Sequence, residues 1–448
     1  MQSDASKALV HMFFATRDTA NIKGVTDKGL KPRKIASVGV IGGGLMGAGI
    51  AAACVLNGVS VLLKEVNQQF LDAGLGRVRS NVESIAKKKK MAPEAVAAIL
   101  GRVRGSLDYS GFDSLDMVIE AVIEELPLKQ RIFADLERVC NKNCILSTNT
   151  STIDITKIGA NLGCPERLLG AHFFSPAHVM QLFEIVRTPA TSAQAIVDTL
   201  GFSKQIKKMP VVVGNCTGFA VNRVFFPYTM AACLLVDLGI DPYRIDAVIA
   251  QQFGMPMGPF RLSDLVGADI GAHVGANVVD TWPERVYRTH LIPSLVAAKR
   301  LGEKSGAGFY KFEGAKRKAA PDPEGLAPFL AASRAQCTLP KPPPGAFTDA
   351  DIIEFIFFPV VNEASRVIGE GIVAKPSDLD VASVLGMGFP PFRGGVVKWA
   401  DTVGAPRIAQ RLAEWSRSYG AFFAPSDFLV AAAKEGRKLG AGAPKSKL

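Results

Sequence analysis

The sequence predicts an α/β fold with a doubly wound, mostly parallel sheet, followed by a duplicated all-α region. Short β-branched runs alternate with helical patterns over the first half of the chain, and one helical pattern occurs twice in the second half. The chain has 448 residues, enough for about two or three domains. The expected strands are 36–41, 59–63, 117–122, 144–147, 168–172 and 183–186, and the expected helices between them include 69–89, 92–100 and 128–139.

The first expected strand leads directly into the glycine-rich segment Gly-Gly-Gly-Leu-Met-Gly at 42–47. In this G-x-G-x-x-G pattern, the first glycine suits a tight turn, the second suits close approach to a pyrophosphate, and the third lets the next helix pack on the strand. A helix that begins here offers free N–H groups and a positive dipole end to phosphate. The pattern predicts a Rossmann-like dinucleotide site formed by Gly42, Gly44, Leu45, Met46 and Gly47.

An acidic residue follows the second expected strand. Glu65 lies 18 residues after Gly47. A carboxylate at this place accepts both ribose hydroxyls of an adenosine and repels a 2′-phosphate. We therefore expect NAD rather than NADP as the cofactor, although the neighbouring Lys64 is a cation that weakens this argument.

His172 stands at the end of an apolar expected strand, and Glu184 lies on the next one. The connection between these strands is short for a crossover helix, so we expect an antiparallel pair. A lone histidine is more often structural than catalytic. A carboxylate bonded to one ring nitrogen, however, fixes the tautomer, raises basicity and leaves the other nitrogen for proton transfer. The pair therefore suits a dehydrogenase that takes the hydroxyl proton of an alcohol.

Residues 147–152, Ser-Thr-Asn-Thr-Ser-Thr, end another expected strand. They are typical of an N-cap cluster for the following helix. Asn149 and Ser151 also suit contact with a nicotinamide and a substrate oxygen, and one turn can serve both purposes. Residues 120–129 follow a third strand end, where acidic residues beside a proline are ordinary helix-start chemistry.

The charge balance favours anionic partners. The net charge is +11, which attracts polyanions such as nucleic acid, anionic lipid or phosphate-rich cofactors. The sharpest basic run is 87–90, which by itself reads as a solvated helix end. Nucleic acid is expected only as a non-specific secondary partner. No apolar run approaches the roughly 18 residues of a membrane span. The seven cysteines are scattered without zinc spacing, so we expect no metal.

The sequence ends in Ser446, Lys447 and Leu448 after a flexible Gly/Ala stretch. Ser-Lys-Leu at the extreme C-terminus is an address read by the peroxisomal import receptor. We therefore expect import into the peroxisome, or glyoxysome, and a location in its matrix.

The second half contains an internal repeat at a constant offset of 132 residues. Phe-Phe-Pro at 225–227 recurs at 357–359, and the pairs Gly239/Gly371, Asp246/Asp378 and 254–261/386–393 keep the same offset; Asp264 then matches Asp401 after an insertion. Two copies of one helical unit are expected. The expected divisions are a junction helix at 1–30, the dinucleotide-binding domain at 31–214, the first copy at 215–312, a Pro/Ala/Lys-rich linker at 313–347, the second copy at 348–437 and a tail at 438–448.

Together these motifs resemble the L-3-hydroxyacyl-CoA dehydrogenases, and in particular the dehydrogenase half of the plant-type peroxisomal multifunctional proteins of fatty-acid β-oxidation. The resemblance runs from about residue 8 to the end and is carried by 40–47, 147–151, 172–176, 184–186 and 218–223. It implies NAD-dependent oxidation of (S)-3-hydroxyacyl-CoA to 3-oxoacyl-CoA. The sequence begins near the junction with a hydratase/isomerase half, so we expect dehydrogenase activity alone.

The resemblance also implies roles for individual residues. His172 is the expected general base and Glu184 holds it, while Ser151 bonds the reacting oxygen and Asn222 fixes the substrate. Glu65, Glu124, Lys129 and Asn149 are the expected NAD contacts outside the glycine turn, and Lys87 and Lys88 are the expected contacts with CoA. The alternatives are a dehydrogenase of other 3-hydroxy acids and a non-catalytic module that binds polyanions.

Overall fold

The computed structural model describes residues 3–314, 317–343 and 345–442. Contacts between residues divide the chain into two units. The sheet unit comprises Phe14–Phe219 with Ile372–Ala374, and the helical unit comprises Met1–Phe13, Ala220–Gly371 and Lys375–Leu448.

The sheet unit contains eight strands in the order β3-β2-β1-β4-β5-β6-β7-β8. All neighbouring strands are parallel except β6 and β7, which are antiparallel. The predicted doubly wound, mostly parallel sheet and its one antiparallel pair are therefore confirmed. The strands are β1 (Ser37–Ile41), β2 (Ser60–Lys64), β3 (Val103–Ser106), β4 (Met117–Glu120), β5 (Ile145–Thr148), β6 (Leu168–Phe173), β7 (Leu182–Arg187) and β8 (Met209–Gly214).

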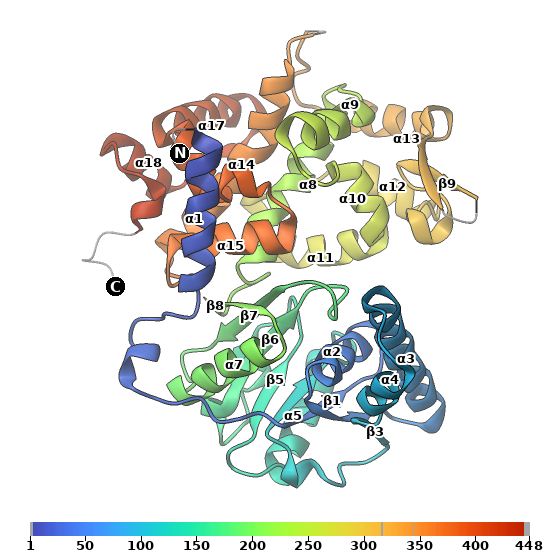
Figure 1. Ribbon diagram of the computed structural model, residues 1–448. Helices are drawn as coiled ribbons and strands as arrows, with labels where there is room; N and C mark the ends of the chain where they lie inside the picture. Colours follow the sequence, from blue (N-terminus) through green and yellow to red (C-terminus); the bar gives the residue numbers. More distant parts are fainter. Residues whose placement is uncertain (1–2, 315–316, 344, 443–448) are drawn as a thin grey trace. The chain divides into compact units, whose positions relative to one another are not determined.

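Helices cover both faces of this sheet (Figure 1). The apolar side chains of the strands and of α2 are buried together, including Val38, Val40, Leu63 and Ile119. Burial on both faces explains why the parallel strands read as continuous apolar runs. The helices are α2 (Leu45–Leu56), α3 (Gln68–Lys89), α4 (Pro93–Leu100), α5 (Leu126–Val139), α6 (Ile155–Ile158) and α7 (Ala193–Gln205).

The two edge strands were not among the expected strands. β3 has the sequence Val-Arg-Gly-Ser, which shows neither an apolar run nor an alternation, because an edge strand buries little of its surface. β8 is apolar, but it leads directly into a long helical stretch. Both strands extend the predicted sheet without changing its class.

The helical unit centres on two long helices, α8 (Val221–Asp237) and α14 (Asp349–Gly369), which pack against each other. Each contains an interior proline, Pro227 and Pro359. The remaining helices are α1 (Asp4–Asp18, of which the first residues belong to this unit), α9 (Pro242–Ala247), α10 (Pro259–Val266), α11 (Ala268–Thr281), α12 (Leu291–Ala297), α13 (Pro323–Gln336), α15 (Pro376–Met387), α16 (Val396–Val403), α17 (Ala405–Tyr419) and α18 (Asp427–Lys434).

The structure shows the repeat and corrects its register. Gly239 and Gly371, at an offset of 132, both have left-handed backbone. Beyond them the offset increases, because the second copy has longer connections. Asp246 accepts the N–H groups of two residues in the first turn of α10, and Asp380 does the same for α16. The counterpart of Asp246 is therefore Asp380, and the expected partner Asp378 is wrong by two residues.

A close backbone approach supports this register. A Cβ atom on Gly258 would lie 2.3 Å from the Cα of Asp246, and one on Gly395 would lie 2.4 Å from the Cα of Asp380. Both glycines precede the equivalent helices α10 and α16. The two copies thus place the same aspartate against the same helix start.

Most of the expected linker at 313–347 is structured. The strands β9 (Tyr310–Glu313) and β10 (Lys318–Pro321) form an antiparallel hairpin, and the 14-residue helix α13 follows. An N-cap at Asp322 accepts the N–H of Gly325 and starts this helix. The proline-rich composition concealed this helix, because proline reads as a helix breaker although it is favourable in the first turn, where Pro323 lies. Residues 337–343 and 345–347 carry no helix or strand.

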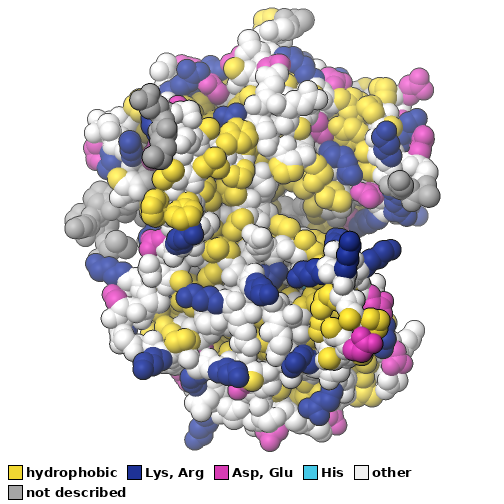
Figure 2. All heavy atoms as spheres, in the orientation of Figure 1, with side chains coloured by type: hydrophobic (Ala, Val, Ile, Leu, Met, Phe, Trp, Pro, Cys, Tyr) yellow, Lys and Arg dark blue, Asp and Glu magenta, His cyan; other side chains and the backbone are white. Residues whose placement is uncertain are grey.

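Hydrophobic side chains are exposed along α1, among them Leu9 and Phe13, each about half exposed (Figure 2). On its other side Ala8 and Met12 are buried. In the described part of the chain, no helix has the length and apolar character needed to cross a membrane.

Candidate active site

The glycine turn joins the end of β1 to α2. Gly42 has φ +98°, a conformation that other residues rarely adopt. A Cβ atom on Gly47 would lie 1.8 Å from the carbonyl oxygen of Gly42, so only glycine fits at that helix turn. Gly44 is the N-cap of α2, and neither a capping side chain nor an acidic residue occupies the first turn. The backbone N–H groups of this first turn suit the binding of a pyrophosphate. Leu45 is largely exposed beside the turn, and Met46 is half-buried.

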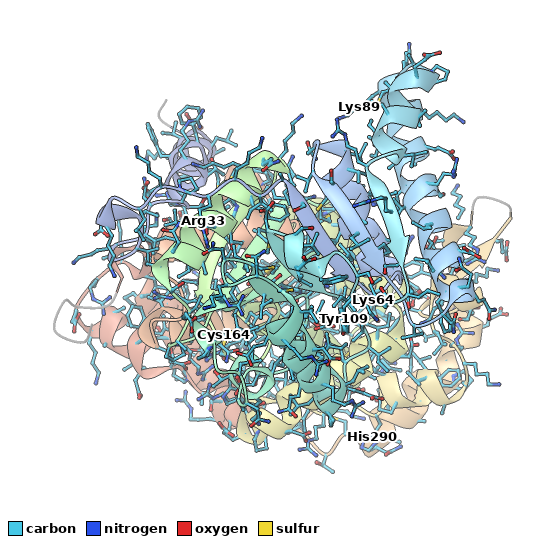
Figure 3. All side chains as sticks on the ribbon, turned by 90° about the horizontal axis from the view of Figure 1, so that it is seen from below. Arg33, Lys64, Lys89, Tyr109, Cys164 and His290 are labelled. Atoms are coloured by element: carbon cyan, nitrogen blue, oxygen red, sulfur yellow. The ribbon has the colours of Figure 1, made fainter. Side chains whose placement is uncertain are left out.

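Glu65 stands beside this turn, at the end of β2. Its Oε1 accepts the N–H of Gly43 at 2.5 Å, and its Oε2 accepts the N–H of Val66 at 3.1 Å. The carboxylate is therefore held between the turn and the strand end, with lone pairs left for further donors. The neighbouring Lys64 lies over the ring of Tyr109, with its Nζ 4.7 Å from the ring centroid (Figure 3).

His172 and Glu184 form a buried pair across the antiparallel strands β6 and β7. The two residues are direct cross-strand partners, and His172 Nδ1 lies 2.7 Å from Glu184 Oε2. His172 is 5% exposed and Glu184 is fully buried. The ring of His172 also packs on Phe174 and Phe219, at centroid distances of 4.6 and 5.5 Å. With Nδ1 on the carboxylate, Nε2 is the nitrogen available to another group.

The end of β4 carries a buried ion pair. Lys129 Nζ lies 2.7 Å from Glu120 Oε1 and 3.3 Å from Glu124 Oε2. The Lys129 side chain is 1% exposed and that of Glu120 is completely buried, whereas Glu124 is 30% exposed. Lys129 was expected to contact NAD, and in this structure its amine is enclosed by the two carboxylates.

The turn after β5 is tied to this ion pair. Glu124 accepts the hydroxyl of Thr150 at 2.9 Å and the N–H of Ser151 at 3.1 Å. The Oδ1 of Asn149 accepts the N–H of Phe173 at 2.8 Å, which joins this turn to the residue after His172. The expected N-cap cluster at 147–152 does not cap α6: the N-cap is Asp154, whose side chain accepts the N–H of Thr156, while Thr150 Oγ1 accepts the N–H of Ile153 in the turn before the helix.

The expected CoA contacts lie at the outer end of α3. Lys87 and Lys88 are exposed in the last turn of this helix, and Figure 3 shows Lys89 at its tip. Burial lowers the pKa of His178, and the positive charges of Lys208 and Lys88 lower it further. Lys88 is thus a cation close to the segment that connects β6 and β7.

Asn222 belongs to the helical unit, where it is half-buried in the first turn of α8. Its neighbour Arg223 is 1% exposed and bonds Glu363 at 2.7 Å and Glu370 at 2.6 Å. In the second copy, the position of Asn222 is taken by Glu354, which pairs with Arg407 and Arg411.

The sheet unit therefore brings together most of the predicted residues. The glycine turn, Glu65, Glu124, Asn149, Ser151 and His172 all follow or end strands at the carboxyl edge of the parallel sheet, where open α/β sheets bind ligands. Asn222 belongs to the helical unit, and Ser446, Lys447 and Leu448 lie outside the described residues. Sequence reasoning missed Glu120. The available signal was an acidic residue that ends an otherwise apolar strand.

Comparisons with known proteins identify the two domains. The NAD-binding domain of 3-hydroxyacyl-CoA dehydrogenases matches residues 37–216, and the C-terminal domain of the same enzymes matches residues 218–312. The chain is 53% identical over 99% of its length to a glyoxysomal fatty-acid β-oxidation multifunctional protein of Brassica napus, and it spans 61% of that relative.

Two solved structures extend this result. (S)-3-Hydroxybutyryl-CoA dehydrogenase from Ralstonia eutropha is 34% identical with a TM-score of 0.59, over 63% of this chain and all of that protein. The dehydrogenase part of multifunctional enzyme 1 from C. elegans is 28% identical with a TM-score of 0.66, over 94% of this chain and 96% of that one. The site geometry, the two domain matches and these relatives together show that the chain belongs to the 3-hydroxyacyl-CoA dehydrogenase family.

Proposed function

We propose that this chain oxidises the hydroxyl group of an (S)-3-hydroxyacyl-CoA to a ketone with NAD, giving 3-oxoacyl-CoA and NADH. The observation that supports this most directly is the His172–Glu184 pair at the carboxyl edge of a sheet whose glycine turn fits a dinucleotide. A carboxylate that orients an imidazole suits the removal of a hydroxyl proton.

In the proposed mechanism, His172 Nε2 takes the hydroxyl proton of the substrate. Glu184 holds Nδ1 and stabilises the imidazolium that forms, because the buried carboxylate lies 2.7 Å from that nitrogen. NAD, when bound, would accept the hydride that leaves the substrate carbon bearing this hydroxyl. Ser151 is proposed to bond the reacting oxygen, and Asn222 to fix the substrate.

The proposed cofactor contacts follow the same edge of the sheet. Glu65 is proposed to accept the ribose hydroxyls of NAD, since its carboxylate stands next to the turn at Gly43. Glu124 and Asn149 are proposed to contact the nicotinamide half. Lys129 is proposed to act through Glu124 rather than directly, because its own side chain is 1% exposed.

The CoA part is proposed to bind the outer end of α3. Lys87 and Lys88 are exposed, and with Lys89 they place three cations in the last turn of this helix. Such a surface attracts the phosphates of CoA.

We further propose that the chain corresponds to the dehydrogenase half of a peroxisomal multifunctional protein, imported into the matrix through Ser446-Lys447-Leu448. The support is the 53% identity to a glyoxysomal relative and the sequence of the last three residues. Fusion of a fluorescent protein to the N-terminus should give punctate peroxisomal fluorescence. Deletion of Leu448 should make it diffuse, and unchanged puncta would contradict the import proposal.

The activity is tested by following NADH absorbance with purified protein and (S)-3-hydroxybutyryl-CoA. The expected result is NADH formation that is absent with the (R) enantiomer and lost in His172→Gln. If the protein binds both NAD and the acyl-CoA yet forms no NADH, the non-catalytic alternative is favoured instead.

A further inference from the structure

Glu120 stands out among the buried charged residues of the sheet unit because its carboxylate receives donors from three different segments. Its Oε1 accepts the N–H of Val122 and the amine of Lys129, each at 2.7 Å, and its Oε2 accepts the hydroxyl of Thr148, also at 2.7 Å. These donors come from the loop after β4, the first turn of α5 and the last residue of β5. One carboxylate thus joins three segments at the carboxyl edge of the sheet.

The charges around Lys129 let Glu120 determine which groups the carboxylate of Glu124 bonds. Lys129 is shared between Glu120 at 2.7 Å and Glu124 at 3.3 Å. Because Glu120 neutralises most of this buried cation, Glu124 keeps its oxygens for Thr150 and Ser151. Without the charge of Glu120, Lys129 would draw Glu124 into a tighter pair, since a buried ammonium ion needs a counter-charge.

We propose that Glu120 is a positioning residue: its charge fixes Lys129 and thereby sets Glu124 and the turn at Thr150–Ser151 for NAD and substrate. This inference rests on the proposed function and extends it to a residue that never touches the ligands. Glu120 is completely buried, so it acts only through the groups that it bonds.

A purely structural role is the competing explanation. A buried ion pair does not by itself indicate a contribution to stability, because apolar residues of the same volume often give an equally stable or more stable fold. The bonds of Glu120 instead converge on the segment that carries Glu124 and on the strand that leads to Ser151. The two explanations differ in what they predict for ligand binding.

The test is Glu120→Gln in the full chain. The amide keeps the shape, accepts from Lys129 and Val122 and donates to the Thr148 oxygen, so the fold is expected to survive. Removing the charge should weaken NAD binding about tenfold, equivalent to one charge-assisted hydrogen bond. NAD binding is measured by calorimetry without turnover, and kcat and KM are measured separately.

Asp198→Asn is the matched control. Asp198 is also completely buried in the sheet unit and bonds Arg33 and Gln194, but it lies on α7. Its replacement should lower the melting temperature and leave NAD binding unchanged. If Glu120→Gln behaves like this control, Glu120 is only structural and the inference is wrong.

A second variant tests the charge balance itself. In Glu120→Gln with Lys129→Met, no cation remains to draw Glu124 away, so NAD should bind more tightly than to Glu120→Gln alone. If the double variant binds no better, the role assigned to Lys129 is overturned. If the wild-type chain itself forms no NADH while these binding differences appear, the proposed reaction fails and the positioning role stands.

Discussion

His172 and Glu184 face each other directly across the one antiparallel strand pair of the sheet, with Nδ1 and Oε2 2.7 Å apart. Because adjacent strands hold the two residues at the same register position, the pair is set by backbone hydrogen bonds rather than by flexible loops. Such a rigid support favours a single orientation of the imidazole ring.

Glu184→Gln should abolish most of the activity while NAD still binds. The amide can donate to Nδ1, which leaves the proton on Nε2 and prevents that nitrogen from accepting the substrate proton. By analogy with the corresponding change in catalytic triads, kcat should fall about 10²–10⁴-fold. Steady-state kinetics and NAD calorimetry check this, and a variant with wild-type kcat would contradict the pairing.

Glu65→Gln should reduce the preference for NAD over NADP. The amide still accepts the N–H of Gly43 but no longer repels a 2′-phosphate, and it bonds ribose hydroxyls more weakly. We expect kcat/KM for NAD to fall about tenfold and the NADP:NAD ratio to rise. Glu83→Gln, at an exposed position of α3, is the control and should alter neither value.

Lys88→Ala should raise KM for the acyl-CoA substrate and leave KM for NAD unchanged. The effect should be about threefold to tenfold at low salt and should shrink as salt is added, because exposed charges are screened. Lys142→Ala removes an exposed lysine elsewhere in the sheet unit. If this control raises KM equally, general surface charge rather than the end of α3 attracts the substrate.

Arg223→Met should destabilise the helical unit strongly. The guanidinium is buried against Glu363, Glu370 and the ring of Trp282, and its loss leaves carboxylates short of a partner. We expect a loss of about 3–5 kcal/mol in the free energy of unfolding, measured with urea. The exposed Arg407→Met should change it by only about 0.5 kcal/mol; similar losses in both variants would contradict the special role of Arg223.

Asp246→Asn should alter the pH dependence of stability. Burial raises the pKa of Asp246 to about 6, well above the ordinary value of an aspartate. The folded form therefore holds a proton that the unfolded chain releases, and this stabilising contribution is full below about pH 4 and is lost as the pH rises through about 6.

Asparagine cannot ionise, so the stability of the variant does not fall as the pH rises through about 6 on account of this side chain. It still forfeits an acceptor for the N–H of Arg261 and the hydroxyl of Tyr310, so it should be less stable than the wild type. The deficit should be largest near pH 4 and shrink by about 2–3 kcal/mol towards pH 7. Urea unfolding over this range measures it, and a deficit that grows with pH would contradict the raised pKa.

The sheet was predictable because its central strands are buried on both faces and therefore read as apolar runs. The glycine turn was equally clear, since Gly42 and Gly47 occupy places that a Cβ cannot. β3 was not predictable, because an edge strand with the sequence Val-Arg-Gly-Ser carries no periodic signal. The linker was misread because proline inside and before α13 resembled a breaker.

The candidate site residues that could be predicted are those that lie at the ends of strands. His172 and Glu184 follow from the strand pattern, whereas the enclosure of Lys129 depends on tertiary packing that no local pattern records. The register of the repeat likewise depends on tertiary contacts. A constant offset in sequence aligned Asp246 with Asp378, but only the hydrogen bonds to the helix starts identify Asp380 as its counterpart.

Asp246 and Asp380 also differ in their third partner. Asp246 accepts the hydroxyl of Tyr310, which lies 64 positions later, whereas Asp380 is bonded to His11, 369 positions earlier in the chain. At about 5–20 residues per second on the ribosome, α1 is made some tens of seconds before the aspartate that receives it. Ala8 and Met12, which folding buries on α1, therefore stay uncovered through most of synthesis, and this helix completes its packing only near the end of translation.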